Sequence, residues 1–136
     1  MEKPKNKAIG DFGEKQAQKY LRKNKYKIIC TNYRQKYGEI DIIAEKDNYV
    51  VFVEVKTRDE NCRYAPVYAV TKTKQTKLMK TAYIYLKEYP TNKNIRFDII
   101  EIIYSGKKVN SINHIKNAFI QGGTYGSFWF TLWHLV

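Results

Sequence analysis

GEIDIIAEKDNYVVFVEVKTR, residues 38–58, is the stretch that decides the fold, because two runs rich in β-branched residues flank a polar turn. Asp47 and Asn48 favour a turn between these runs. We therefore predict a β-hairpin with a two-residue loop, in which Lys46 pairs with Tyr49. A three-residue loop would change every pairing that follows from this register.

Charged side chains interrupt both strands of this hairpin on one face. In the predicted register Asp41 faces Glu54 and Glu39 faces Lys56. Facing side chains of an antiparallel pair lie about 5 Å apart, so like charges repel there unless they are compensated. A divalent cation compensates them best, because Mg²⁺ takes carboxylate oxygens and keeps positions for water and a substrate phosphate. Lys56 could then orient water or stabilise charge on a phosphoryl group.

The opposite face of the hairpin is apolar and supports the same register. It carries Ile40, Ile42, Val53 and Val55, and a slip by one residue would bury the charges instead. The alternative to a metal site is a solvated face with an ion pair between Glu39 and Lys56, worth under about 1 kcal/mol. The run VVFV is more typical of a strand covered on both sides. The pattern alone leaves both interpretations open.

The composition predicts one globular domain with a polyanionic partner. The chain has 136 residues, and Lys plus Arg outnumber Asp plus Glu by 25 to 13, a net charge of +12. Nucleic acid or an acidic membrane surface would suit this charge, although AT-rich coding DNA also enriches Lys. No run reaches the about 18 apolar residues of a membrane span, and the hydrophilic start lacks a secretory signal. We expect a cytoplasmic protein.

The rest of the chain alternates helical and strand patterns. Apolar residues recur at helical spacing over residues 8–24 and 71–89, and further strands are predicted over residues 26–33 and 96–104. INHIKNAF, residues 112–119, is predicted to be a short closing helix. This order favours a mixed sheet flanked by helices. Asp98 is interpreted as a structural or supporting residue, and His114 as an ordinary one.

GEIDIIA followed by VVFVEVKTR resembles the paired signature of the YraN-like family of small bacterial proteins, placed in the PD-(D/E)XK nuclease superfamily near archaeal Holliday junction resolvases. The resemblance extends to GDFGEKQAQKYL, AVTKTKQTKLMKTAYIYL, RFDIIEI and INHIKNAF, and covers residues from about 10 to 119 in order. It implies a restriction-endonuclease-like α/β fold, in which helices flank a mixed sheet of four to five strands and the active site lies at one edge.

The resemblance also implies site residues. Asp41 and Glu54 look like the metal-binding acids of the superfamily, and Lys56 looks like its active-site lysine in the motif EVK. Glu14 looks like the additional helix acid of the resolvase-like branch, an auxiliary metal ligand. Ile40 stands where the motif often has proline. The implied cofactor is Mg²⁺, with Mn²⁺ as a substitute.

Nucleic-acid contacts are expected from three further residues. Lys74 and Gln75 fall where the family has a Lys-Gln pair on its second helix, and Arg58 lies just beyond the strand with the motif. The implied function is hydrolysis of DNA phosphodiesters, including branched or single-stranded forms. The rival is a nucleic-acid-binding protein that retains the fold without cleaving. A homodimer would allow symmetric cutting of a junction, but no dimer surface can be read from the residues.

The end of the chain departs from the family. Related chains usually stop near NAF, whereas here IQGGTYGSFWFTLWHLV follows. We predict a nuclease-like domain over residues 1–120 and an apolar tail of doubtful origin over residues 121–136. The tail could cover an exposed surface or join subunits, and a frameshift or read-through product is the favoured interpretation.

Overall fold

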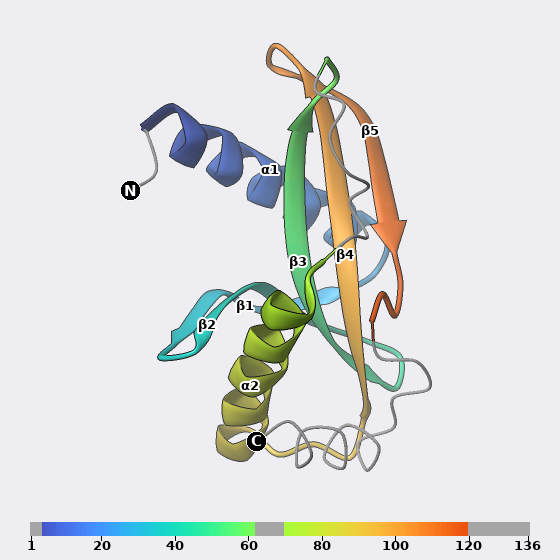
Figure 1. Ribbon diagram of the computed structural model, residues 1–136. Helices are drawn as coiled ribbons and strands as arrows, with labels where there is room; N and C mark the ends of the chain where they lie inside the picture. The colour runs from blue at the N-terminus through green and yellow to red at the C-terminus, as the bar shows by residue number, and fades with distance from the viewer. Residues whose placement is uncertain (1–3, 62–69, 120–136) are drawn as a thin grey trace.

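The computed structural model describes residues 4–61 and 70–119, which form two helices and a five-stranded sheet (Figure 1). In chain order the elements are α1 (Pro4–Lys23), β1 (Lys27–Gln35), β2 (Gly38–Lys46), β3 (Tyr49–Asp59), α2 (Lys72–Glu88), β4 (Asn94–Ser105) and β5 (Lys108–Ile115). The predicted α/β class is confirmed, and the arrangement is consistent with a restriction-endonuclease-like fold. The tail predicted over residues 121–136 lies outside the described residues.

The sheet is mixed, with strand order β1-β2-β3-β4-β5. Neighbouring strands are antiparallel except β3 and β4, which are parallel. A parallel pair needs a crossover connection, and α2 lies on the connection between these two strands. Neither described helix is long and apolar enough to cross a membrane.

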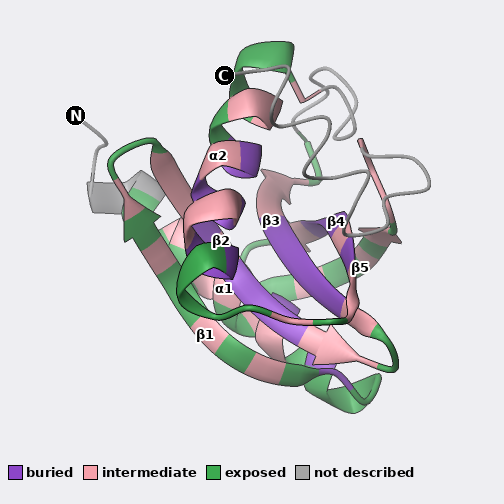
Figure 2. Ribbon diagram, turned by 90° about the horizontal axis from the view of Figure 1, so that it is seen from below, coloured by how far each residue is buried: buried purple, intermediate pink, exposed green. Residues whose placement is uncertain are grey.

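The two helices cover opposite faces of the sheet, and β3 has both of its sides buried (Figure 2). Val50 and Phe52 pack in the hydrophobic cluster under α2, whereas Val51 and Val53 pack in the cluster under α1. Alternate residues of a strand point to opposite faces, so the apolar run VVFV contributes to both clusters. This confirms the prediction of a strand covered on both sides.

The hairpin of β2 and β3 has the predicted two-residue loop, and Lys46 pairs with Tyr49. The pairing ends, however, at Ile42 and Val53, so the predicted pairs further along are not formed. Beyond that point β2 pairs only with β1 and diverges from β3 (Figure 1). The two strands therefore separate just before Asp41 and Glu54, and the predicted pairing of these two residues is not formed.

This separation corrects two details of the predicted register. Glu39 does not face Lys56, because it pairs with Arg34 of β1. The predicted apolar face is also divided: Ile42 packs in the cluster under α1, whereas Ile40 packs in the cluster under α2. The side of the sheet to which β2 side chains point therefore changes between Ile40 and Ile42, where the strand leaves β3.

The predicted closing helix over residues 112–119 is wrong. Lys108–Ile115 forms β5, which pairs antiparallel with β4 after a tight turn at Gly106, where φ is +61°. Ile112 packs in the cluster under α1. The ladder with β4 and this packing outweigh the weak local pattern of the segment.

A buried carboxylate fastens β5 to the core. Asp98 is fully buried and accepts hydrogen bonds from His114 Nε2 at 2.7 Å, from Arg96 Nη2 at 2.8 Å and from the backbone N–H of Asn117 at 3.0 Å. Burial alone would raise the pKa of Asp98, but these donors hold it below its ordinary value. The interpretation of Asp98 as a supporting residue fits this network, which lies away from the site below.

Candidate functional site

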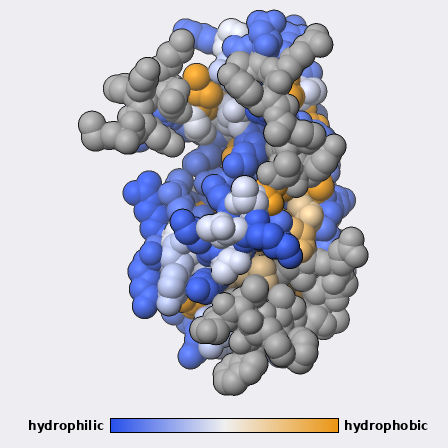
Figure 3. Space-filling model, in the orientation of Figure 1, coloured by the Kyte–Doolittle hydropathy of each residue, from blue (hydrophilic) through white to orange (hydrophobic). Residues whose placement is uncertain are grey.

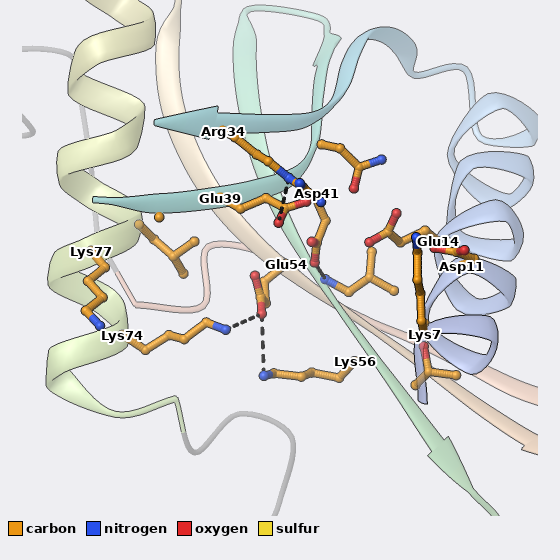
Figure 4. A pocket seen from close by; sticks show the side chains of 16 residues that line it. Lys7, Asp11, Glu14, Arg34, Glu39, Asp41, Glu54, Lys56, Lys74 and Lys77 are labelled. Atoms are coloured by element: carbon orange, nitrogen blue, oxygen red, sulfur yellow. Dashed lines mark hydrogen bonds and ion pairs between the residues drawn. The ribbon is translucent and has the colours of Figure 1, made fainter. Parts of the chain in front are cut away.

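A cavity of about 720 Å³ lies where β2 separates from β3, with α1 on one side and α2 on the other (Figure 4). Its polar walls mix acidic and basic side chains in equal number. They are Lys7, Asp11, Glu14, Arg34, Glu39, Asp41, Glu54, Lys56, Lys74 and Lys77. The diverging strands thus leave a polar hollow between the helices.

Glu54 lies at the centre of this cavity, on the part of β3 that β2 no longer covers. Its side chain is only 7% exposed, and its Oε1 contacts Lys74 Nζ at 2.9 Å and Lys56 Nζ at 3.4 Å (Figure 4). Burial alone would lower the pKa of Lys74. The neighbouring Glu54 carboxylate outweighs burial, so the pKa of Lys74 is raised. Lys74 is therefore a permanent cation at neutral pH.

Asp41 projects from β2 into the same cavity. Its Oδ2 accepts a hydrogen bond from the backbone N–H of Val55 at 2.8 Å, which bridges the gap between the separated strands. Burial, followed by repulsion from Glu54, raises the pKa of Asp41 from 3.8 to about 8. Two carboxylates at such a site resist simultaneous ionisation unless a cation compensates them.

Glu14 reaches the cavity from α1. Burial raises the pKa of Glu14, a hydrogen bond from Asn32 opposes that shift, and the charge of Glu39 adds to it. In the amide orientation that donates, the Asn32 nitrogen lies 3.1 Å from Glu14 Oε2 and 2.8 Å from Glu39 Oε1. Asn32 thus links the acids of α1 and β2.

The cavity also has polar wall residues that the sequence did not predict, and two of these, Asn32 and Arg34, contact its acids. Asn32 has a positive φ of 53° within β1, a conformation that asparagine tolerates. Its only signal was an asparagine inside a β-rich run. Arg34 Nε lies 3.3 Å from Glu39 Oε2 and partly neutralises that acid. The pair forms because Arg34 and Glu39 are neighbours across β1 and β2.

Two predicted nucleic-acid contacts lie elsewhere. Gln75 does not line the cavity, and its Nε2 donates to the backbone carbonyl of Val70 at 2.9 Å. Arg58 also lies outside the lining, with its Nη1 3.1 Å from Glu101 Oε2. Of the predicted basic contacts on α2, the structure brings Lys74 to the site and adds Lys77 beside it.

The acids present fit a divalent cation with hard oxygen ligands. Asp41, Glu54 and Glu14 offer carboxylate oxygens, and a cation among them would relieve the burial and repulsion that raise the pKa of Asp41. Within the described ranges, no group of three His, Cys, Asp or Glu side chains is already arranged to hold a metal ion. A Mg²⁺ site that leaves positions to water and phosphate suits this arrangement, whereas a closed zinc site does not.

The substitution Asp41→Asn should stabilise the metal-free protein, and increasingly so as the pH rises. The unfolded chain releases the Asp41 proton near a pKa of 3.8, whereas the folded protein releases it near 8. Wild type therefore loses stability relative to the variant across this interval. Because water reaches the cavity, we expect a gain of about 2 kcal/mol at pH 8, less than the full linkage value. Urea unfolding in EDTA at several pH values measures it.

A matched control is Glu60→Gln, which removes an exposed acid outside the cavity. It should show no pH-dependent gain of this kind. A gain in Asp41→Asn that is the same at pH 4 and pH 8, or a loss at both, would contradict the buried-acid account.

Comparison with known proteins gives this chain relatives over most of its length. A model of the family described as "Uncharacterised protein family UPF0102" matches residues 13–102. A UPF0102 protein of Syntrophomonas wolfei is 45% identical over 115 residues, which cover 84% of this chain and 99% of the relative. A UPF0102 protein of Clostridium beijerinckii is 45% identical over 117 residues, covering 84% and 94% of the two chains. One from Clostridium botulinum strain Hall is 47% identical over 117 residues, covering 84% and 95%.

Proposed function

The chain belongs to the uncharacterised family UPF0102, the YraN-like family, and from its site we propose a Mg²⁺-dependent nuclease-like enzyme that hydrolyses DNA phosphodiesters. One observation carries the proposal: the carboxylates of Asp41 and Glu54 line a single cavity together with the ammonium groups of Lys56 and Lys74. Phosphodiester hydrolysis requires carboxylates that can hold a cation and, beside them, basic groups that can bind phosphate. The net charge of +12 supports a polyanionic substrate.

The metal would be held by Asp41 and Glu54, with Glu14 as an auxiliary ligand. Once bound, Mg²⁺, or Mn²⁺ in its place, would supply Lewis-acid polarisation of a phosphoryl oxygen and a lowered pKa of water.

The lysines would act on the phosphate. Lys74 remains protonated because of Glu54, so it serves as a cation for phosphate oxygens and not as a general base. Lys56, 3.4 Å from Glu54 Oε1, is suited to orient the attacking water and to stabilise the charge that develops in the transition state. Hydrolysis proceeds in line, with water entering opposite the leaving oxygen.

Cleavage of a small DNA panel tests the proposal. The panel contains a four-way junction, a flap, a linear duplex and a single strand, each incubated with Mg²⁺, Mn²⁺ or EDTA. We expect cleavage of at least one substrate with Mg²⁺ or Mn²⁺ and none in EDTA, because the acids need a cation to act on phosphate. Wild type is run beside Asp41→Ala, which should be inactive. Cleavage that persists in EDTA would contradict the proposal.

A second candidate function is binding without cleavage. Lys56 and Lys74 both contact Glu54, so this carboxylate is already compensated by protein cations. Such a site could hold nucleic acid through its basic groups and need no metal. Salt-sensitive binding without cutting on any substrate of the panel would favour this alternative, since both functions neutralise phosphates but only one requires the acids.

A further inference from the structure

Tyr37 stands at the tip of the arm formed by β1 and β2, in the turn between the two strands. Its side chain is 38% exposed and belongs to neither hydrophobic cluster of the described residues. Lys36 Nζ lies 4.9 Å from the ring centroid and Lys80 Nζ lies 5.1 Å from it. Cations at these distances interact with the ring, so Tyr37 is held at the surface by charge and not by the core.

A second hollow of about 450 Å³ lies beside this ring, and α2 forms its other wall. Lys77 lines both this hollow and the cavity that contains Glu54, so the two adjoin at that residue. The tip lies against α2 at Gly38, where an added Cβ would be in van der Waals contact with Lys77 Cβ at 3.8 Å. The φ of Gly38 is +153°, a backbone conformation that favours glycine. The fold thus places an exposed aromatic ring next to the proposed cleavage site.

The second hollow is basic, unlike the first. Its walls are Lys36, Tyr37, Thr73, Thr76, Lys77 and Lys80, with no carboxylate. Within residues 4–61 and 70–119 none of these lysines forms an ion pair with an acid. Figure 3 shows mostly hydrophilic residues on the face that carries this arm and α2. An anionic partner fits this surface better than an apolar one.

We propose that Tyr37 stacks an unpaired base of single-stranded DNA while Lys36, Lys77 and Lys80 hold the adjoining phosphates. An exposed ring among cations is the arrangement that binds single strands, because every base has a face that can stack. A base inside a duplex is already stacked and cannot use the ring. The inference rests on the proposed function and refines it, since it assigns a single-stranded stretch beside the scissile bond.

Binding measured without catalysis tests this subsite. The full chain in EDTA is titrated into a fluorescein-labelled single strand and into a duplex of the same sequence, and fluorescence anisotropy gives both Kd values. Tyr37→Ala should weaken binding of the single strand by about tenfold, equal to about 1.4 kcal/mol, and that of the duplex by less than about twofold. Tyr37→Phe keeps the ring and should stay within about twofold of wild type for both.

Two further variants separate stacking from charge and from general damage. Lys80→Ala should weaken both ligands and reduce the salt slope of binding by about one unit, because it removes one phosphate contact. Tyr89→Ala removes a tyrosine that is 56% exposed and lies outside both hollows, so it should change neither Kd. A 2-aminopurine base in the single strand should be quenched by wild type and not by Tyr37→Ala.

The proposal is overturned if Tyr37→Ala weakens single strand and duplex equally, if it changes neither, or if wild type does not bind the single strand at low salt. These outcomes are distinct from failure of the proposed function. A selective Tyr37 effect without any cleavage would leave the subsite in a binding protein. Metal-dependent cleavage without a Tyr37 effect would leave the enzyme and remove the subsite.

Discussion

Glu54→Gln should lower Mg²⁺-dependent cleavage by about 10²–10³-fold while leaving the binding of DNA equal to wild type or tighter. Glutamine keeps the shape of the side chain but removes the negative charge that the cation needs. Removal of that charge also frees the ammonium groups of Lys56 and Lys74, which contact Glu54 at 3.4 Å and 2.9 Å. More basic charge is then available to phosphate, so affinity does not fall.

The measurement pairs a cleavage assay with anisotropy in EDTA on the same substrate. Glu88→Gln is the matched control, because Glu88 belongs to α2 but lies outside the cavity. It should cleave at the wild-type rate. Unchanged cleavage in purified Glu54→Gln would refute the assigned mechanism. If wild type binds without cleaving, a gain in affinity in Glu54→Gln would show that the site holds phosphate in a protein whose task is binding.

Gly13→Ala should destabilise the fold by about 2 kcal/mol and lower the Tm by about 6–10 °C. A Cβ at Gly13 would overlap Thr57 Oγ1 and stand 2.9 Å from Thr57 Cβ, far inside van der Waals contact. Helix α1 therefore packs on β3 only because residue 13 has no side chain. The steric cost exceeds the about 1 kcal/mol that alanine gains over glycine within a helix. Thermal unfolding followed by circular dichroism measures the shift.

Gly10→Ala on the same helix is the control, because a Cβ there has no neighbour within 4 Å. It should stabilise the protein by up to about 1 kcal/mol. The second substitution Thr57→Ala removes Oγ1 and Cγ2 but keeps Cβ, which would still lie 2.9 Å from the new side chain, so it should restore only part of the stability of Gly13→Ala. Equal effects at the two glycines would show that α1 does not depend on this close approach. Displacement of α1 would also move the neighbouring Glu14, so cleavage should fall in Gly13→Ala and recover in part in the double variant.

The hairpin shows how far local sequence information reaches. Alternating apolar residues and a two-residue turn suffice to predict the pairing of Lys46 with Tyr49, because each is a local property of the chain. The same residues continue beyond Ile42 and Val53 with an unbroken β pattern, yet the strands separate there. A pattern of period two describes one strand at a time and carries no information on where a neighbouring strand stops pairing.

The segment over residues 112–119 shows the opposite case. Its weak apolar spacing resembled a helix, but Lys108–Ile115 forms β5 because β4 offers a free edge and Asp98 binds His114. Contacts between residues distant in sequence decided this element. Such contacts override propensities worth a fraction of a kcal/mol per residue.

The sequence by itself determined the family, the α/β class, the hairpin turn with its register as far as Ile42 and Val53, and the candidate acids Asp41 and Glu54, because periodicity and motif spacing are local. Only the tertiary structure decided which groups meet. It placed Glu14 and Asn32 in the same cavity as these acids and left Gln75 and Arg58 outside it. It also placed Tyr37 beside Lys80. The physical reason is that the cavity opens where β2 and β3 separate between helices packed on opposite faces, and that geometry depends on contacts between distant parts of the chain.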